Sequence, residues 1–555
     1  MLKVVGASWL QTRFATYILV AVALLGIGAI IMGEYGLIEN DGIYAASVSY
    51  YKEGYHIDFW GQGNDLTNVR LGAARAYYKT GISESGWSVI EIETSSKYPD
   101  SVQAYAAGLL EGSLTWQLIH RHWYNTVHAV CERRAGECRK LMRFLRENTA
   151  IVRKRAEILA VTDSFWHMVR LFYIQLDGLE AGWRFAARRS RQEGVDEMDS
   201  EHFLWLAMAN LMDLEQISTN NDFHSHCDHT KGMIILKSLT REGLDPLIAI
   251  GHTTAAPYAK MLRLLKKYTF AYHTLPKKAA PVPGRTVVMS SYPGALSSQD
   301  EFYLIVRDNR ELIVAGTVTA VAANRSLWNS TNAKDQVMSP VRVMAANRLA
   351  TDGRSWSRDM SAHNMTGAMA QQWVTLEPRE GFVHLVERSL SGTSARAIDI
   401  TERFANSGVF WITGEACSRE TNTPGEANDE KEDENVTRSD LIVSLQKNIT
   451  TVEQFEELMG GHSDEQPSIE DKDQAQILTY RGDLKKSAST PFGVIDAKIV
   501  LADGEGVASF DAISGPSTSA SREPFSWSKS FPNVSHLGQP DVFDFDSVTP
   551  LWVWI

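Results

Sequence analysis

The residues with the densest potential for chemistry form one short run, His224-Ser-His226-Cys227-Asp228-His229. Thiolate and imidazole are the preferred protein ligands of zinc, so the run allows a metal site. Its spacing fits no common structural zinc pattern, and no second CxxC or HxxxH completes such a site. A polar loop ahead of a strand is the simpler interpretation, and we expect neither a metal nor a cofactor.

A third interpretation of this run comes from the residues on its C-terminal side. Two short apolar runs, 233–236 and 247–250, flank Arg241-Glu242-Gly243, a pattern that predicts a β-hairpin. Cys227 lies just ahead of the first strand and His252 just past the second, nearly equidistant from a turn around residue 240. An antiparallel pair would bring the two side by side at the open end of the ladder. An imidazole or a free amine can turn a thiol into a thiolate, so the spacing favours a cysteine hydrolase.

Helices are expected ahead of this hairpin, from residue 98 to about residue 192. Apolar residues recur there at helical spacing, behind a start signal at Pro99, and the periodicity continues through 141–158 and 165–185. The first apolar face consists of Tyr105, Leu109, Trp116, Ile119 and Trp123.

Strands are expected after residue 230. Beyond the hairpin, the runs 287–289, 302–306, 312–321 and 494–501 have strand-like composition. Helices followed by paired strands predict an α+β protein with a mostly antiparallel sheet. Residues 419–440 differ, because eight acidic and three basic residues leave almost nothing apolar, and we expect a mobile acidic loop there.

Composition limits the classes of function. The chain has 555 residues, of which 44% are hydrophobic and 22% charged, as in a folded globular protein. Its formal net charge is −12 and it has no long basic stripe, so we expect no nucleic-acid partner. The oligomeric state cannot be read from these features.

The N-terminus predicts export. Lys3 and Arg13 precede an apolar run over 17–32, which is either a signal peptide or a signal anchor in contact with a membrane. In an oxidising lumen, Cys131 and Cys138 could form a disulfide; the alternative is two buried thiols. Six sequons fit N-glycosylation, at Asn324, Asn329, Asn364, Asn435, Asn448 and Asn533.

Several blocks, in order from about residue 60 to the C-terminus, resemble the phospholipase B-like family. They are Trp87-Ser-Val-Ile-Glu-Ile-Glu, Tyr98-Pro-Asp-Ser-Val-Gln-Ala-Tyr-Ala-Ala-Gly, Ser290-Ser-Tyr-Pro-Gly, Ala346-Asn-Arg-Leu-Ala-Thr-Asp-Gly, Phe525-Ser-Trp-Ser-Lys and His536-Leu-Gly-Gln-Pro-Asp. The resemblance implies a four-layer αββα fold of the N-terminal-nucleophile hydrolase type, with a helical N-terminal portion. It also implies a secreted or lysosomal proenzyme that hydrolyses an ester or amide acyl bond of a lipid.

Carried onto this chain, the resemblance implies cleavage between His226 and Cys227. Residues 1–33 would be the signal peptide or anchor, 34–226 the N-terminal helical portion, and 227–555 the C-terminal sheet-containing portion of the same domain. Cys227 would then be the nucleophile, and its α-amine, with a pKa near about 8, would be the base.

The same resemblance implies roles for other residues, and at some positions this sequence differs from the family pattern. His252 and Thr319 match family residues at the site, and Arg481-Gly-Asp483-Leu484 resembles an arginine-containing motif near it. Thr319 could equally be an ordinary strand residue, and Arg481 part of an ordinary ion pair. Ala255 replaces a common tryptophan, and Gln371 stands where the family has a paired asparagine that would be a natural oxyanion donor. The alternative is therefore a catalytically impaired protein of the same fold that acts by binding or signalling in development.

Overall fold

The computed structural model describes most of the chain, in segments separated by gaps. The described residues are 17, 20, 42–60, 66–190, 198–209, 232–241, 243, 245–277, 279–308, 310–319, 334–361, 365–366, 370–388, 395–413, 438–460, 479–484, 489–518 and 522–554. The chain divides into two units, Met1–Ile43 and Tyr44–Ile555, and the helices and strands described below belong to the second. Within these segments, no helix is both long and apolar enough to cross a bilayer. The apolar run over 17–32 lies almost wholly outside them.

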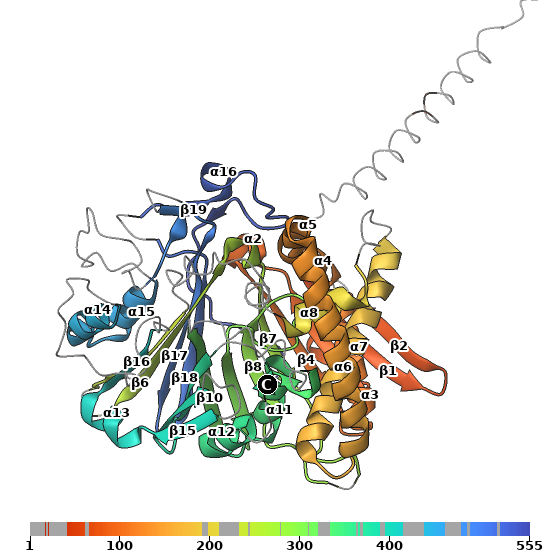
Figure 1. Ribbon diagram of the computed structural model, residues 1–555, viewed down its shortest axis with the longest axis horizontal. Helices are drawn as coiled ribbons and strands as arrows, with labels where there is room; N and C mark the ends of the chain where they lie inside the picture. The colour runs from red at the N-terminus through yellow and green to blue at the C-terminus, as the bar shows by residue number, and fades with distance from the viewer. Residues whose placement is uncertain are drawn as a thin grey trace, which may run out of the picture. The chain divides into compact units, whose positions relative to one another are not determined.

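A large sheet forms the centre of the second unit (Figure 1). β4 and β7 pair in parallel, whereas β7 to β10 and β13 to β15 form antiparallel pairs. In spatial order its strands are β15 (Ala395–Asp399), β14 (Phe382–Arg388), β13 (Ala370–Glu377), β10 (Arg310–Thr319), β9 (Phe302–Arg307), β8 (Thr286–Ser291), β7 (Arg263–Thr269), β4 (Trp87–Thr94), β3 (Ala74–Lys79), β1 (Ile43–Tyr51) and β2 (Gly54–Trp60).

A smaller antiparallel sheet faces one side of the large one. Its order is β16 (Val409–Ile412), β5 (Met233–Leu239), β6 (Leu247–Pro257), β17 (Phe492–Asp503) and β18 (Gly506–Ser514). Side chains alternate between the faces of a strand, so Ile234 and Leu236 enter the core between the sheets while Met233 and Ile235 face outward. Short strands β11 (Val337–Met338), β12 (Met365–Thr366), β19 (Phe525–Ser526) and β20 (Val542–Phe543) lie outside both sheets.

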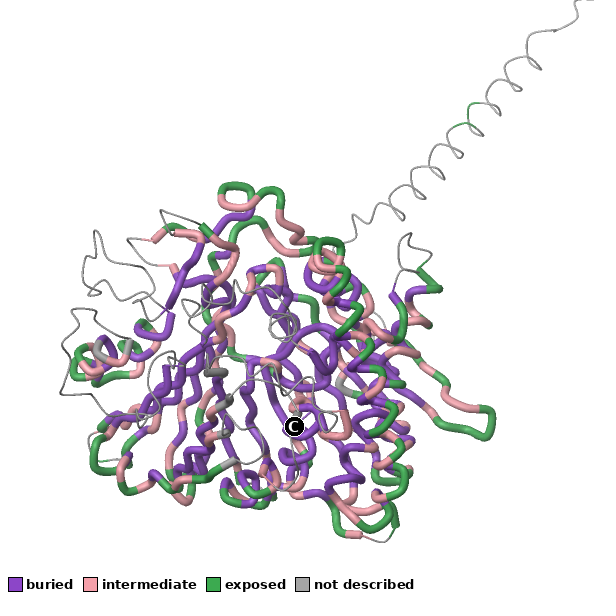
Figure 2. The backbone as a smooth tube through the Cα atoms, in the orientation of Figure 1, coloured by how far each residue is buried: buried purple, intermediate pink, exposed green. Residues whose placement is uncertain are grey.

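Helices cover the outward faces of both sheets, and Figure 2 shows the buried strands between them. The large sheet packs against α3 (Asp100–Leu114), α4 (Trp116–Trp123), α6 (Ala135–Leu159), α7 (Ser164–Ser190), α8 (Ser200–Met208), α11 (Ser339–Leu349) and α12 (Gly353–Ser361). The small sheet packs against α14 (Arg438–Leu445) and α15 (Val452–Gly460). Shorter helices are α2 (Ile82–Ser85), α5 (Ala129–Arg133), α13 (Thr401–Ser407) and α16 (Trp527–Ser530). The mixed α+β class is therefore confirmed.

Helices α3 and α7 approach each other closely through glycines. A Cβ on Gly108 would lie 1.9 Å from the Gln175 carbonyl oxygen, and one on Gly182 would lie 2.0 Å from that of Leu109. No side chain fits at either position, so these glycines let two long helices pack backbone against backbone over the sheet.

The helices and strands expected from the sequence are largely found. α3 to α7 fill most of 98–192, and the hairpin, β8 to β10 and β17 lie where the apolar runs predicted strands. Two expectations need correction. The N-terminal portion is not only helical, because β1 to β4 belong to the large sheet. The acidic loop ends before residue 438, because α14 begins at Arg438 and buries Leu441 and Ile442; the rest of 419–440 lies outside the described residues.

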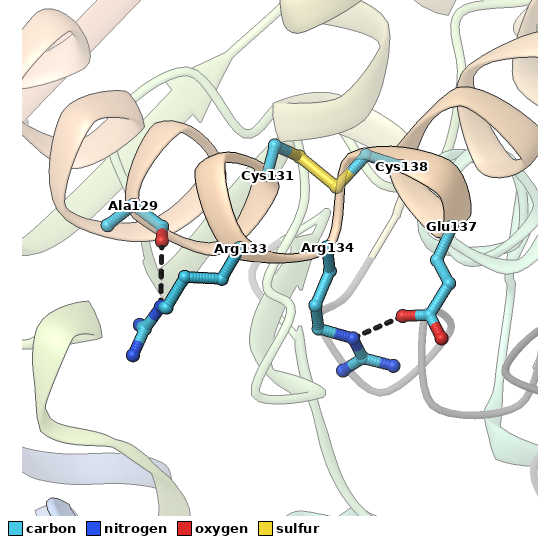
Figure 3. The surroundings of a disulfide bond; sticks show 6 residues. All are labelled: Ala129, Cys131, Arg133, Arg134, Glu137 and Cys138. Atoms are coloured by element: carbon cyan, nitrogen blue, oxygen red, sulfur yellow. Dashed lines mark hydrogen bonds and ion pairs between the residues drawn. A yellow bond between two sulfur atoms is a disulfide. The ribbon is translucent and has the colours of Figure 1, made fainter. Parts of the chain in front are cut away.

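The structure joins Cys131 and Cys138 in a disulfide (Figure 3). Cys131 lies in α5 and Cys138 in the first turn of α6, with Arg134 at the junction. Arg134 pairs with Glu137, so a covalent bond and an ion pair both fix the angle between the two helices.

Candidate functional site

The expected site lies where three strands from both sheets meet. β5 begins at Met233, β6 carries His252 and Thr253, and β10 passes opposite them with Gly316 and Thr317. Side chains of β6 and β10 donate hydrogen bonds across the gap between the sheets. The start of β5 is thereby fixed against both neighbouring strands.

His252 is a buried, neutral imidazole. Its Nε2 lies 2.8 Å from the Gly316 carbonyl oxygen, which can only accept, so Nε2 carries the hydrogen. Burial, helped by the charge of Lys498, lowers the pKa of His252 to about 3. Nδ1 is therefore a lone-pair acceptor, and it has no hydrogen-bond partner within the described residues.

Two threonines fix the residues at the start of β5. The Met233 N–H donates to Thr253 Oγ1 over 3.1 Å, and Thr317 Oγ1 donates to the Gly232 carbonyl over 3.2 Å. A Cβ on Gly232 would lie only 1.7 Å from the Thr253 carbonyl oxygen. The position directly ahead of β5 therefore accepts no side chain without backbone movement.

The hairpin register differs from the one expected. Ile234 is opposite His252 and Met233 is opposite Thr253, which centres the turn on residue 243 instead of 240. The expected centre of the turn is therefore wrong, and this register does not pair position 227 with His252. Cys227 itself lies outside the described residues, as does the rest of the run from His224 to His229.

Thr319 and Gln371 lie near each other at one end of the large sheet. Thr319 is the last residue of β10 and pairs with Ala370, and Gln371 pairs with Val318. Thr319 is three residues beyond Gly316, or about 10 Å along the strand. The backbone thus brings both predicted residues to the end of β10 that contacts His252.

Arg481 is buried and fully engaged in structural contacts. Its guanidinium donates to Asp483 and to the carbonyls of Ser517 and Glu523, at 3.1 and 2.6 Å for the two carbonyls. The pair is not at the surface, because the two side chains are 3% and 2% exposed. Arg481 also pairs with Gly493, beside the end of β6, rather than with the His252 region. These contacts hold Arg481 in the scaffold, and its predicted role toward substrate stays a prediction.

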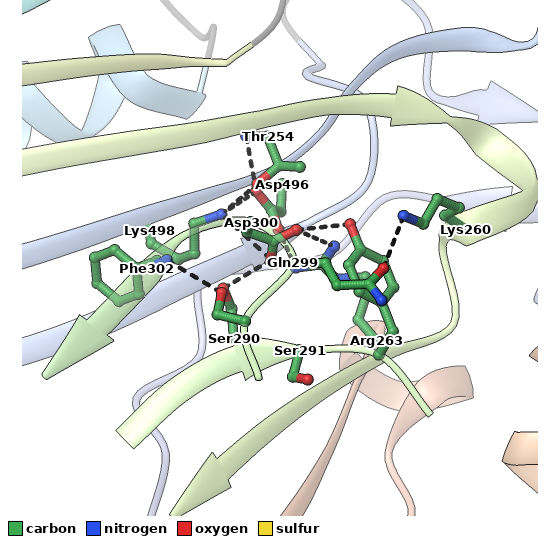
Figure 4. A network of polar contacts seen from close by, with 12 residues as sticks. Thr254, Lys260, Arg263, Ser290, Ser291, Gln299, Asp300, Phe302, Asp496 and Lys498 are labelled. Atoms are coloured by element: carbon green, nitrogen blue, oxygen red, sulfur yellow. Dashed lines mark hydrogen bonds and ion pairs between the residues drawn. The ribbon is translucent and has the colours of Figure 1, made fainter. Parts of the chain in front are cut away.

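A buried network of charges, which the sequence did not reveal, lies next to His252 (Figure 4). Lys498 of β17 is the register partner of His252, and its Nζ is 2.5 Å from Asp496 Oδ1 and 2.7 Å from Thr254 Oγ1. Arg263 pairs with both Asp300 and Asp496, and all four charged side chains are fully buried.

Asp300 is the centre of this network. It accepts from Ser290 Oγ at 2.8 Å and from the Tyr292 hydroxyl at 2.6 Å, besides its pair with Arg263. Burial alone would raise its pKa, but the charges of Arg263 and Lys498 outweigh burial and lower it. Ser290 and Tyr292 belong to the Ser-Ser-Tyr-Pro-Gly block, which was the sequence signal that could have located the network.

No group of three or more potential metal-ligating side chains occurs in the described part of the chain. The zinc interpretation of the run from His224 to His229 lies outside that part and stays untested. The chemistry that the described residues offer is a buried acceptor at His252 Nδ1, beside a fixed strand start.

Comparison with known proteins identifies the relatives of this chain. The phospholipase B family profile matches residues 74–550. The phospholipase B-like lamina ancestor protein of Drosophila melanogaster is 39% identical over 399 residues, which are 68% of this chain and 60% of that protein. Human phospholipase B-like 2 is 30% identical over 85% of this chain and 84% of its own length. Phospholipase B-like protein C of Dictyostelium discoideum is 26% identical over 88% of each. The chain therefore belongs to the phospholipase B-like family.

Proposed function

We propose that this protein is an acyl hydrolase of the N-terminal-nucleophile type, with Cys227 as nucleophile after cleavage between His226 and Cys227. Its substrate is a lipid with an ester or amide acyl bond. The family membership supports the reaction class, and the two facing sheets with helices on their outer faces support a four-layer αββα assignment.

The observation that carries this proposal is the fixed start of β5 next to a buried imidazole. Met233 and Gly232 are each held by a threonine from a different sheet, and His252 is the register partner of Ile234, the second residue of β5. Gly232 is the fifth residue after Cys227, so the covalent chain limits the distance between their Cα atoms to about 18 Å. This limit is compatible with a thiol that acts on the region from the segment ahead of β5.

The proposed cleavage and turnover use the same thiol. Cys227 Sγ attacks the His226 carbonyl carbon, and the C–N bond breaks as its nitrogen takes up a proton, which frees the Cys227 α-amine and leaves a thioester. Water then hydrolyses the thioester, which leaves a carboxylate on His226 and regenerates the Cys227 thiol. In turnover, this amine takes the thiol proton and the thiolate attacks the acyl carbonyl. The ammonium then protonates the leaving alcohol or amine, and water, deprotonated by the amine, hydrolyses the acyl-thioester.

His252 serves this scheme as a neutral acceptor rather than as the base. An imidazole with a pKa of about 3 is too weak to remove a proton from a thiol of pKa about 8.5. Its Nδ1, which has no partner in the described segments, can accept a hydrogen bond from the amine or thiol and so orient that group.

The export pathway is the proposed compartment, with the mature protein secreted or lysosomal. A disulfide at Cys131–Cys138 fits an oxidising lumen, and the sequon residues Asn448 and Asn533 are both exposed. The remaining sequons, at Asn324, Asn329, Asn364 and Asn435, lie outside the described residues.

A second candidate function is binding or signalling by a catalytically impaired member of the fold. One observation favours it: the Arg481 guanidinium, which was expected near the substrate, donates to Asp483 and to two backbone carbonyls.

N-terminal sequencing of the secreted, deglycosylated protein tests the proposal. We expect a fragment beginning at Cys227 after incubation at acidic pH, and no such fragment from Cys227→Ala. Cys131→Ser with Cys138→Ser is the matched control, since it removes two cysteines elsewhere and should leave cleavage intact.

Hydrolysis separates the two candidate functions. The cleaved protein is incubated with phosphatidylcholine vesicles and with an N-acylethanolamine, and released fatty acid is measured. Release by the cleaved wild type but not by Cys227→Ala supports the hydrolase. An uncleaved chain refutes the proenzyme proposal, and a cleaved chain that releases no acid favours the binding protein.

A further inference from the structure

Lys498 occupies an unusual place for a charged residue, because it lies between the two sheets opposite His252. Its side chain has no exposed surface, and it sits in the middle of β17, where β6 is the neighbouring strand. A buried lysine is unfavourable unless it is paired and hydrogen-bonded. What it contacts therefore indicates what it does.

The hydrogen bonds of Lys498 lead to the strand that carries His252. Nζ donates to Thr254 Oγ1 and to Asp496 Oδ1, and the same Asp496 oxygen accepts the Thr254 N–H over 3.1 Å. Both the backbone and the side chain of Thr254 are thus fixed two residues beyond His252. The ladder of β6 with β17 is irregular between Val494 and Asp496, which lets Asp496 reach Thr254.

The His252 ring is fixed from the opposite side by the large sheet. Nε2 donates to Gly316 of β10, and the Phe302 ring of β9 lies 5.5 Å from the imidazole centroid. Lys498 Nζ lies 5.9 Å over the same Phe302 ring, so the lysine and the imidazole share one aromatic wall.

The charges that act on His252 can be named from each element packed there. They are Lys498 from β17, Arg263 from β7, and Asp300 from the connection between β8 and β9. Burial has the largest effect on the His252 pKa, the Lys498 charge is the next and lowers it further, and Asp300 opposes them. Lys498 is thus the cation with the largest effect on an imidazole whose Nδ1 has no partner among the described residues.

We propose that Lys498 is a positioning residue that holds His252 as the neutral Nε2–H tautomer and keeps Nδ1 aimed as an acceptor for a donor group at the active site. This rests on the proposed function only for the identity of that donor, the amine or thiol of Cys227. The positioning itself acts through Thr254 and through the charge of the ammonium, and both can be removed separately.

Two variants separate charge from hydrogen bonding. Lys498→Met removes the ammonium and keeps the length of the side chain, and Thr254→Val removes its acceptor while the Lys498–Asp496 pair stays. Ser290→Ala is the matched control, because it removes a buried hydrogen bond to Asp300 on the side of the network away from Thr254.

The readout is the protonation and tautomer of His252 in protein labelled with ¹⁵N-histidine, with the signal assigned by its loss in His252→Gln. In the wild type and in Ser290→Ala we expect one Nε2–H tautomer that does not titrate between pH 8 and pH 4.5. In Lys498→Met the protonated fraction at pH 4.5 should rise at least about tenfold, equivalent to one pKa unit. In Thr254→Val we expect a second, Nδ1–H tautomer.

Failure of this inference is distinct from failure of the proposed function. If Lys498→Met and Thr254→Val both leave the His252 signals unchanged, Lys498 is only a scaffold residue and the inference is overturned. If Lys498→Met does not fold, Thr254→Val alone decides. Absence of a Cys227 fragment would refute the hydrolase and leave the NMR comparison as the test of Lys498.

Discussion

Replacing Asp300 with asparagine removes one charge from the buried network and leaves its shape nearly unchanged. Asp300 receives hydrogen bonds from Arg263, Ser290 and Tyr292, and Lys498 Nζ is 3.9 Å away. An asparagine accepts through one oxygen only, and its NH₂ group would face donors. Breaking a buried ion pair by removing one partner costs about 3–5 kcal/mol, because the other charge stays buried without compensation. We expect this loss for Asp300→Asn.

The melting temperature gives this free energy a measurable scale. The unit Tyr44–Ile555 has an unfolding entropy of about 1 kcal/mol/K, from about 2.1 cal/mol/K per residue. The expected decrease in melting temperature is therefore about 3–5 °C at neutral pH. Calorimetry at one scan rate measures it. Asp503→Asn is the matched control, since Asp503 also pairs with an arginine, Arg241, but at a partly exposed site where the loss should be below about 1 °C.

The pH dependence gives a second check on the same residue. The folded-state pKa of Asp300 lies below its usual value, so its stabilising contribution is present above the unfolded pKa of about 3.9. That contribution is lost as pH falls toward the folded pKa. The difference in melting temperature between the wild type and Asp300→Asn should be constant from pH 8 to pH 5 and should become smaller below about pH 4. If Asp300→Asn lowers the melting temperature at neutral pH no more than Asp503→Asn does, the reasoning is refuted.

Other parts of the structure give three further predictions. Asn448 and Asn533 are exposed, so Asn448→Gln and Asn533→Gln should each remove one glycan from protein made in a secretory host, seen by intact mass. Because the pKa of His252 is lower in the folded protein than in the unfolded chain, the free energy of unfolding decreases as the pH falls from about 6.5 to about 3. His252→Gln should make the decrease between pH 7 and pH 4.5 smaller by about 2.5 kcal/mol, measured by denaturant unfolding at each pH. Glu91 Oε2 accepts the backbone N–H groups of Val553 and Trp554, so Glu91→Ala should release residues 551–554 and increase their hydrogen exchange without changing exchange in α7.

The sequence predicted the elements better than their register. The apolar periodicity from Tyr105 to Trp123 found α3 and α4, because side chains on a buried helix face must repeat every three to four residues. The hairpin was also found, but its turn lies three residues beyond the expected centre, so the register does not pair position 227 with His252. Register depends on which residues face the core of both sheets, and a single strand does not contain that information.

The buried network could not be predicted for a related reason. Arg263, Asp300, Asp496 and Lys498 are spread over more than two hundred residues, and each lies in a stretch that resembles an ordinary strand or turn. Charged residues are almost never fully buried unless paired, so a prediction from sequence places them at the surface. Only the packing of β6, β7 and β17 shows that their charges compensate one another.

The blocks that identify the family serve the scaffold in this structure. Trp87 lies under the Arg263 guanidinium at 4.9 Å, Tyr292 donates to Asp300, and Gln539 accepts from Trp527 Nε1. These contacts stabilise the sheets whether or not the protein turns over a substrate, so the family resemblance supports the fold more directly than the activity.

The question of activity therefore rests on a few positions at the site. Arg481, engaged by Asp483 instead of facing the site, is a described position that argues against chemistry. His252 argues for it, because its buried Nδ1 has no hydrogen-bond partner among the residues that the structure describes, and a buried acceptor is unfavourable unless a donor arrives. If the donor is the Cys227 amine, cleavage before Cys227 should stabilise the folded protein, because the amine then donates a hydrogen bond to His252 Nδ1. The tautomer signal should then sharpen on cleavage in the wild type and stay unchanged in Cys227→Ala.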